Sequence, residues 1–299
     1  MILRGRPARP QDFQLLWGLL AKQPAYPHTN WGPLRDEFGA IMRSGGALTL
    51  ILEDVELRPP TTLAVITAAF ISDGSATDLL SLEEPFVRRL VCKQGFLAST
   101  TEILSQHRNR GLHLFIFDFA WEQCDTSRTS TILTSAWSQF MGLHCGWHLN
   151  SVLTEAHTEQ TQKMATDNGY LPVNEFLGWK GCNRGGPFNP RLFCVTRSQA
   201  NTSHSYTMKQ LFRWGAPRCA FDERQRKMLR LAMAGCADQE IAHELGFSKE
   251  RVKQLWPDIY LLLNEKYPGQ LPHETLKRRR ALPSFLRDEA ASELRPDLG

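Results

Sequence analysis

The apolar positions in the first two thirds of the chain form short runs that are typical of strands. We predict strands at five of these runs, namely residues 48–52, 63–71, 112–119, 149–154 and 192–196. The turn signal Arg58-Pro59-Pro60 separates the first two runs, which therefore predict a β-hairpin.

Helical patterns alternate with these runs. Residues 131–141 predict one helix, and residues 157–168 predict another that ends at Gly169, a good left-handed cap. Because strands and helices interleave, we predict that residues 1–197 form an α/β or α+β domain.

The last third of the chain contains helical patterns only. Asp222 with Gln225 three residues later predicts a capped helix, which ends at Gly235. Asp238 is predicted to cap a second helix that ends at Gly246. Ser248 is predicted to cap a third helix that runs towards Leu263. The short Gly246-Phe247-Ser248 connection gives these two helices helix-turn-helix spacing.

Charge divides the chain in a similar way. Residues 1–212 hold 19 Lys/Arg and 18 Asp/Glu, whereas residues 213–287 hold 15 and 9, a net charge of +6. Residues 288–299 hold one Arg and four acids. We therefore predict four segments: a sensor or scaffold domain (1–197), a polar linker (198–218), a basic helical domain (219–287) and an acidic tail (288–299). The basic excess favours a nucleic-acid partner.

Residues 221–263 resemble the helix-turn-helix of LuxR/GerE-type transcription regulators. The resemblance is carried by Arg224, Arg226, Leu229-Arg230-Leu231, Gly235, Glu240-Ile241-Ala242, Leu245, Ser248, Val252-Lys253 and Ile259-Tyr260. It implies an all-α DNA-binding domain whose third helix lies in the major groove of double-stranded DNA. It also implies a homodimer on a pseudo-palindromic site, with RNA polymerase as a candidate protein partner.

We predict the following DNA-binding residues: Ser248, Lys249, Arg251, Lys253, Gln254, Arg278 and Arg279. Ser248, Lys249 and Lys253 would contact phosphates, and Lys253 matches the phosphate-contacting lysine of the family. Arg251 and Gln254, three residues apart, can make bidentate contacts to guanine and adenine. Arg278 and Arg279 belong to the basic run at 277–280. The alternative is a protein-interaction module with a solvated basic face.

The sequence departs from the LuxR pattern at several positions. Gln225 stands where the family usually has Glu, Leu255 replaces a common His, and Asp258 a common Asn. Pro257 lies inside the third helix, so we expect that helix to end or bend near Trp256.

The order of elements over residues 112–196 is similar to the second half of a GNAT-type acetyltransferase fold. The best segment is Leu149–Leu153, then Gln160–Asn168, then Gly169–Val173. The family holds the CoA pyrophosphate on a glycine-rich loop, but the corresponding residues 122–129 contain no glycine. The usual general-acid tyrosine aligns with Ala165, which cannot transfer a proton.

The sequence therefore predicts no enzyme, no catalytic residue and no cofactor. The first domain would instead bind an unidentified small-molecule ligand or hold a dimer. The predicted function is a bacterial, cytoplasmic DNA-binding transcription regulator, and the alternative is a GNAT-type N-acetyltransferase with an appended DNA-binding module.

Two further clusters have alternative interpretations. His144 and His148 flank Cys145 and could hold a metal, but a pair of ordinary hydrogen-bonded histidines at a helix end is the more typical arrangement, and we predict no metal site. Six tryptophans could line an apolar pocket or fill the core: Trp17, Trp31, Trp121, Trp137, Trp147 and Trp179.

The remaining features concern the compartment. The seven cysteines form no Cys-x-x-Cys pair, which favours a reduced cytosolic protein. Residues 1–7 lead into no apolar region, so we expect no secretory signal. The uncharged stretch 129–154 is too polar for a membrane span, and we expect no membrane partner.

Overall fold

The structure is a computed structural model. It describes residues 1–8, 12–20, 47–85, 96–122, 124–177, 189–233 and 235–295. The predictions for Trp31 and Trp179 lie outside these ranges. In the part of the chain that is described, every helix is too short or too polar to cross a membrane.

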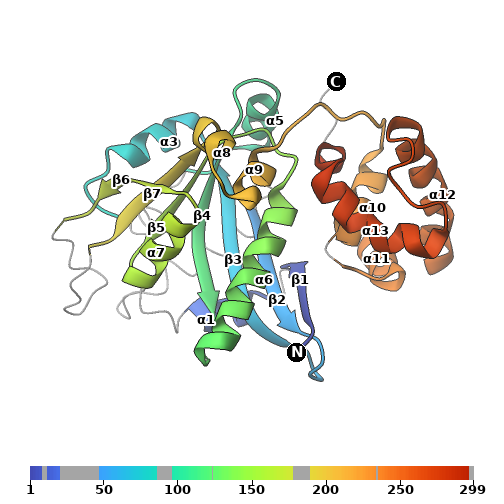
Figure 1. The fold of residues 1–299 in the computed structure, drawn as a ribbon, viewed down its shortest axis with the longest axis horizontal. Coiled ribbons are helices and arrows are strands. Elements are labelled where there is room, and N and C mark those ends of the chain that lie inside the picture. Colours follow the sequence, from blue (N-terminus) through green and yellow to red (C-terminus); the bar gives the residue numbers. More distant parts are fainter. Residues whose placement is uncertain are drawn as a thin grey trace.

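Seven strands among these residues form one sheet in the order β1-β2-β3-β4-β5-β7-β6 (Figure 1). They are β1 (Leu3–Pro7), β2 (Ala47–Asp54), β3 (Thr61–Ile71), β4 (Leu112–Trp121), β5 (Leu149–Ala156), β6 (Leu171–Glu175) and β7 (Arg191–Thr196). Neighbouring strands are antiparallel except β4 and β5, which run parallel.

Helices alternate with the strands and then continue alone. The first group is α1 (Phe13–Leu20), α3 (Asp73–Leu80), α5 (Thr100–Arg108), α6 (Thr126–His144), α7 (Glu159–Asp167), α8 (Arg197–Thr202) and α9 (Tyr206–Phe212). The second group is α10 (Glu223–Met233), α11 (Asp238–Leu245), α12 (Lys249–Lys266), α13 (Thr275–Asp288) and the 3-10 helix η2 (Ala291–Leu294). We call residues 223–295 the C-terminal helices.

Both faces of the sheet are covered, which explains the long apolar run in β3. Leu50 and Ile66 pack with α6 on one face, whereas their neighbours Ile51 and Val65 pack with α1 on the other. Side chains alternate between the faces of a strand, so a strand covered on both faces reads as continuous apolar sequence. Residues 63–71 are accordingly all buried, the polar Thr67 among them.

The predicted hairpin is confirmed, because β2 and β3 pair antiparallel with Leu50 opposite Ile66. Two helices differ from the sequence prediction at their first residues. The helix expected at 131–141 is longer, since the Asp125 carboxylate accepts a hydrogen bond from the Arg128 amide and starts α6 at Thr126. The second C-terminal helix is capped by Ala237, with Glu240 accepting from the Ala237 amide, instead of by Asp238.

The polar segment that predicted a linker is partly helical. Thr196 and Gln199 form a reciprocal capping box that starts α8, and Ala200 is fully buried. In α9, Leu211 and Phe212 pack into the same core as α6. The prediction of a linker from residue 198 is therefore wrong for residues 198–212, because a few apolar positions among polar ones suffice to seat a short helix.

The C-terminal helices have their own apolar core, in which Val252 and Ile259 are fully buried. The third helix does not end at Trp256, because α12 continues through Pro257 to Lys266. The predicted acidic tail is folded in part, since η2 places Glu293 and Leu294 out of solvent. Figure 1 shows these helices gathered to one side of the sheet.

Several contacts hold the C-terminal helices against the sheet domain. Arg4 in β1 pairs with Glu240 in α11 at 3.0 Å. Arg295 donates to the carbonyl oxygen of Cys145 at the end of α6, at 3.0 and 2.7 Å. Gly146 has a φ of +83°, and any Cβ there would overlap the backbone of Ala291. Glycine is therefore required at this position by both conformation and space.

The two histidines near the end of α6 lie in different surroundings. His144 is fully buried and its Nδ1 is 2.9 Å from the Phe140 carbonyl oxygen. His148 stacks on Trp214 and has Nδ1 3.0 Å from the His107 carbonyl oxygen. Among the residues that the structure describes, no group of three or more His, Cys, Asp or Glu could hold a metal. Both histidines are explained by packing and hydrogen bonds.

A first prediction concerns Glu293, whose buried carboxylate accepts from the amides of Arg218 and Cys219 and from the Tyr267 hydroxyl. Glu293→Ala should lower the free energy of unfolding by about 2–4 kcal/mol, because it leaves buried donors unpaired. Urea denaturation measures the change. The exposed Glu289, which pairs with Arg213, is the control. Glu289→Ala should cost less than about 1 kcal/mol, and equal losses would contradict the assignment.

A second prediction concerns pH. Burial lowers the pKa of His107 to about 4 and that of His144 to about 3, so both are neutral in the folded state. The unfolded chain takes up these protons near pH 6.5, so stability should fall as the pH drops from about 6.5 to about 4. At pH 5 the loss is about 2 kcal/mol for each histidine. Urea denaturation at pH 7 and pH 5 measures it.

The variant His107→Gln tests this assignment. Glutamine does not titrate, so the variant should lose less stability between pH 7 and pH 5 than the parent chain. An unchanged slope would show that His107 is not the titrating group.

Candidate functional site

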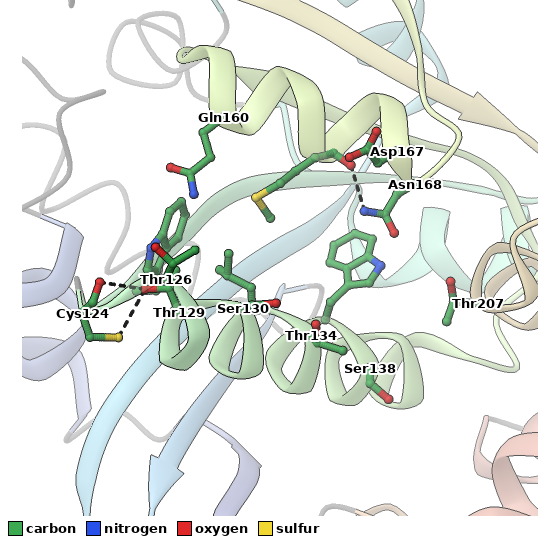
Figure 2. A pocket seen from close by; sticks show the side chains of 14 residues that line it. Cys124, Thr126, Thr129, Ser130, Thr134, Ser138, Gln160, Asp167, Asn168 and Thr207 are labelled. Carbon is green, nitrogen blue, oxygen red and sulfur yellow. Dashed lines mark hydrogen bonds between the residues drawn. The ribbon is translucent and has the colours of Figure 1, made fainter.

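The main candidate site is a cavity of about 950 Å³ between α6 and α7 (Figure 2). Its residues come from the end of β4, from the loop after β4, from α6 and α7, and from α9. They are Trp121, Cys124, Thr126, Thr129, Ser130, Leu133, Thr134, Trp137, Ser138, Gln160, Met164, Asp167, Asn168 and Thr207. The volume is in the upper part of the range that is typical of small-molecule sites.

A row of hydroxyl side chains forms the α6 wall. Thr126, Ser130, Thr134 and Ser138 recur at every fourth position of the helix and all line the cavity, as Figure 2 shows. A spacing of four residues places side chains on one face of a helix. The sequence analysis missed these residues, although the spacing could have revealed them.

One end of the cavity lies at the start of α6. The first-turn amides of a helix have no partner within it and carry partial positive charge. Thr126 is the first residue of α6 and Cys124 precedes the helix, so this end of the cavity lies next to those amides. Asp125 already caps the helix, and its carboxylate binds the Arg128 amide at 3.0 Å. This end can accept an anion at the amides of Thr126 and Ser127.

Tryptophans supply the apolar part of the wall. Trp121 and Trp137 both line the cavity, and the indole nitrogen of Trp137 is buried without a hydrogen-bond partner among the described residues. Behind it, Tyr170 is fully buried with its ring centroid 6.4 Å from that of Trp137. Of the two interpretations of the tryptophans, these two fit a ligand cavity. Trp147 instead packs edge-on against Phe70.

The parallel strands β4 and β5 separate beside this cavity. They pair from Leu112 opposite Leu149 to Ile116 opposite Thr154, and no further. Beyond that point β4 continues to Trp121 paired with β3 alone, and β5 continues paired with β7 alone. On the facing edges of the two strands, the main-chain amides and carbonyls therefore have no partner strand, and Trp121 at the end of this stretch of β4 lines the cavity.

Ala165 and the connection between β4 and α6, the two places where the resemblance implied functional groups, both lie near the cavity. Ala165 lies in α7 and is buried in the core beside the cavity, not in its wall. Residues 122–125 join β4 to α6, and the cavity reaches this connection at Cys124. The Cys124 thiol is exposed, 3.3 Å from the Thr129 hydroxyl.

The predicted DNA-binding residues divide into two sets. Lys249, Arg251, Lys253 and Gln254 are exposed along the first half of α12, and the Ser248 hydroxyl oxygen accepts from the Arg251 amide at 3.1 Å. These five residues thus lie within residues 248–254, at the start of α12, and all are exposed. Arg251 also reaches the Gln254 side chain at 3.4 Å.

Arg278 and Arg279 form the other set and contact their own module. Arg279 lies over the Trp256 ring at 4.1 Å and donates to Asp238 at 3.5 Å. Arg278 donates to the carbonyl oxygens of Pro272 and His273 at 2.7 and 2.8 Å. These contacts give both arginines a structural role, and DNA binding by them stays a prediction.

No protein-family model and no curated protein sequence matches the chain. Solved structures do resemble its sheet domain. An N-acyl amino acid synthase from uncultured soil microbes, FeeM, is 9% identical with a TM-score of 0.41, covering 66% of this chain and 94% of that one. A mosquito arylalkylamine N-acetyltransferase is 11% identical with a TM-score of 0.43, covering 65% and 100%. The ribosomal-protein-S18-alanine N-acetyltransferase of Escherichia coli is 8% identical with a TM-score of 0.39, covering 65% and 94%.

These findings bear on two predictions. The sequence predicted that the chain is not an enzyme, whereas the structures that resemble it are all named as transferases or synthases. The strand order agrees with the expected GNAT-like architecture, because the mixed sheet has a single parallel pair, β4 and β5, followed by α7 and an antiparallel β7. The sheet domain is a mixed α/β domain.

Proposed function

We propose that the protein is a GNAT-type N-acyltransferase that carries an appended DNA-binding module. The observation that carries the first part is the cavity between α6 and α7, which lies beside the separated stretch of β4 and β5. The cavity would hold coenzyme A, and the gap between the strands would hold its acylated arm.

The chemistry of the cavity suits the parts of coenzyme A. Its pyrophosphate is an anion, and helix N-termini bind anions through their free amides. Its pantetheine arm carries two amides, which can pair with the free edge of a strand as an added strand does. The edge of β4 beyond Ile116 offers such groups. The hydroxyl row of α6 would form hydrogen bonds with the other polar groups of coenzyme A.

The reaction would be a direct transfer. An amine nitrogen attacks the thioester carbon, a C–N bond forms, the C–S bond breaks, and sulfur leaves as a thiolate. The proton lost by the nitrogen goes to solvent. A main-chain amide of β4 can stabilise the charge that develops on the carbonyl oxygen.

Ala165 sets a limit on the rate. General acid catalysis typically contributes a factor of about 10²–10⁴, and alanine cannot supply it. A thiolate is a stable leaving group near neutral pH, since thiols ionise at about pH 8.5. Transfer can therefore proceed without the tyrosine, but more slowly than in a GNAT enzyme that has one.

A third prediction tests the cavity. Acetyl-CoA should raise the melting temperature, because a ligand at 100 times its dissociation constant stabilises the folded state by about 2.7 kcal/mol. Thr134→Trp should abolish the shift by filling the cavity from its α6 wall. Differential scanning fluorimetry measures both, and release of free thiol with a panel of amines measures transfer.

The control for this prediction is Thr131→Trp. Thr131 is exposed on the same helix but does not line the cavity, so the variant should keep the shift. No shift with millimolar acetyl-CoA in the parent chain would remove the acyltransferase proposal.

The second part of the proposal is binding of duplex DNA by the C-terminal helices. It is supported by the exposed polar face at the start of α12, where three cations lie within five residues. A helix fits the major groove and its first turns reach the base edges. The competing interpretation is a protein-interaction module, which would need no preference for a base sequence.

A fourth prediction separates these two interpretations. Lys253→Ala should weaken binding to all duplexes and lower the salt slope by about one. Arg251→Ala should instead cost about 1–3 kcal/mol at one base pair and relax the preference there. Selection from a random duplex pool, then fluorescence anisotropy at several salt concentrations, measures both.

Lys266→Ala, at the other end of α12, is the control and should bind like the parent chain. If Lys253→Ala, Arg251→Ala and Lys266→Ala weaken every sequence equally, the assignment of α12 as the reading helix is wrong.

A further inference from the structure

A second, smaller cavity lies at the seam between the sheet domain and the C-terminal helices. Its volume is about 270 Å³, and it is lined by the start of the chain, the end of α6, α10, α11 and the residues after η2. The apolar part of the wall consists of Ala8, Gly142, Leu143, Leu231, Met233 and Leu294. Neither part of the proposed function uses this cavity.

Arg295 places a buried positive charge in the wall. The residue is 4% exposed, and its hydrogen bonds go to the carbonyl oxygens of Leu143 and Cys145. The Trp147 ring lies 4.8 Å from its guanidinium carbon. Within the described ranges no carboxylate pairs with it. Burial lowers the pKa of Arg295 to about 9, which reflects the cost of an uncompensated charge.

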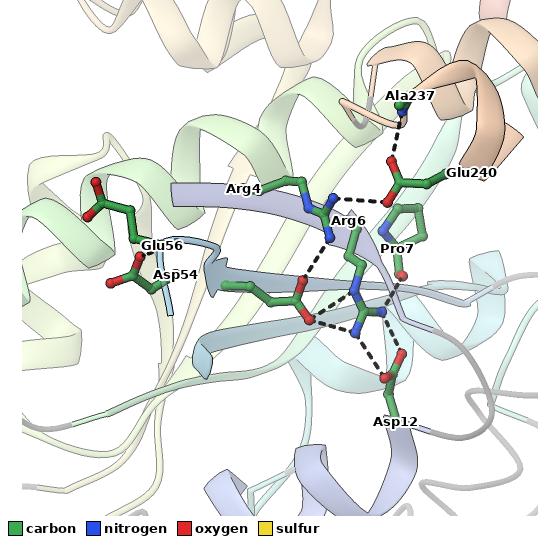
Figure 3. A network of polar contacts seen from close by, with 9 residues as sticks. Arg4, Arg6, Pro7, Asp12, Asp54, Glu56, Ala237 and Glu240 are labelled. Atoms are coloured by element: carbon green, nitrogen blue, oxygen red, sulfur yellow. Dashed lines mark hydrogen bonds and ion pairs between the residues drawn. The ribbon is translucent and has the colours of Figure 1, made fainter. Parts of the chain in front are cut away.

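The other cations in the wall differ in how far they are neutralised. Arg6 binds Asp12, as Figure 3 shows, and also Glu53, so two carboxylates neutralise its charge. Arg230 pairs with Glu223. Lys227 is exposed and pairs with no carboxylate among the described residues.

The charge balance of the wall is therefore positive. Glu244 is the one carboxylate among the described lining residues, and it contacts His243 at 3.8 Å. Arg295 and Lys227 together exceed this single negative charge. A buried charge is costly unless a partner compensates it, so the cavity is suited to a negative group.

We propose that the seam cavity binds a small organic carboxylate with an apolar body. The carboxylate lies between Arg295 and Lys227, and the apolar body lies against Leu143, Leu231 and Met233. The cavity is slightly smaller than typical ligand sites, which fits a medium-chain or aromatic acid and excludes a whole CoA thioester. The ligand would touch α6 of the sheet domain and α10 together.

Such a ligand would strengthen the attachment of the two parts. Binding to the folded, joined arrangement alone shifts the equilibrium towards that arrangement by mass action. The carboxylate would thus act as an effector at the seam, separate from the CoA cavity.

The test uses the full chain with sodium octanoate as the probe and octanamide as its neutral counterpart, in isothermal titration calorimetry. Octanoate should bind saturably, and octanamide should bind at least tenfold more weakly. Lys227→Gln should weaken octanoate about two- to fivefold, the range expected for a partly exposed ion pair. Leu231→Phe should weaken octanoate binding at least fivefold by placing a larger, rigid ring in the apolar wall of the cavity.

Three controls locate the site. Arg224→Gln removes an exposed cation of α10 that does not line the cavity, and it should leave octanoate binding unchanged. Thr134→Trp, which fills the CoA cavity, should also leave it unchanged. Arg295→Met should abolish binding, with circular dichroism showing that the variant is folded. If that variant does not fold, Leu231→Phe and Lys227→Gln decide the question.

The proposal is overturned if octanoate does not bind, if octanamide binds equally well, or if Leu231→Phe and Lys227→Gln leave binding intact. Loss of binding in Thr134→Trp would assign octanoate to the CoA cavity and would also overturn it. Failure of acetyl-CoA to bind leaves the seam proposal untouched, because the two cavities share no residue.

Discussion

The burial of one face of α6 on the sheet is the interaction on which the rest of the structure depends. Ile132, Ala136 and Phe140 are fully buried against strands β2 and β3. A Phe buried in this way contributes several kcal/mol, as large-to-small substitutions in cores show. Because this face of α6 is fixed on the sheet, the opposite side of the helix forms a wall of the large cavity. The C-terminal end of α6 contacts the C-terminal helices.

Buried polar groups take part in attaching the C-terminal helices. Glu293 is satisfied by the amides of Arg218 and Cys219, which precede those helices, and by the Tyr267 hydroxyl, whereas Arg295 is satisfied across the seam by carbonyl oxygens alone. Buried charges of this kind are expensive and directional. Such groups favour one arrangement of the sheet domain and the C-terminal helices. The positive charge of Arg295 is paired with carbonyl oxygens only, and the proposed carboxylate ligand would compensate it.

The large cavity combines polar and apolar walls. It is bordered by the hydroxyl row of α6, two tryptophans and the start of that helix. In the proposed function these groups would hold coenzyme A, and the position at which the resemblance implies a proton donor holds alanine, buried beside the cavity. The rate of transfer would then depend on how well the cavity places the reacting atoms.

The sequence alone determined the elements whose signals are local. The hairpin of β2 and β3 follows from two apolar runs around a proline turn. Gly246 and Ser248 define the end of α11 and the start of α12 through left-handed and capping conformations. The hydroxyl spacing in α6 was also present in the sequence, but without the fold nothing showed that this face borders a cavity.

Only the tertiary structure decided the features that depend on distant partners. The polar segment at 198–212 became helical because its few apolar side chains reach a core built by other elements. Within the predicted acidic tail, Glu293 is buried because it meets donors from residues 218, 219 and 267. The separation of β4 from β5 and the unpaired charge of Arg295 have no local signature, since each arises from the packing of segments far apart in the chain.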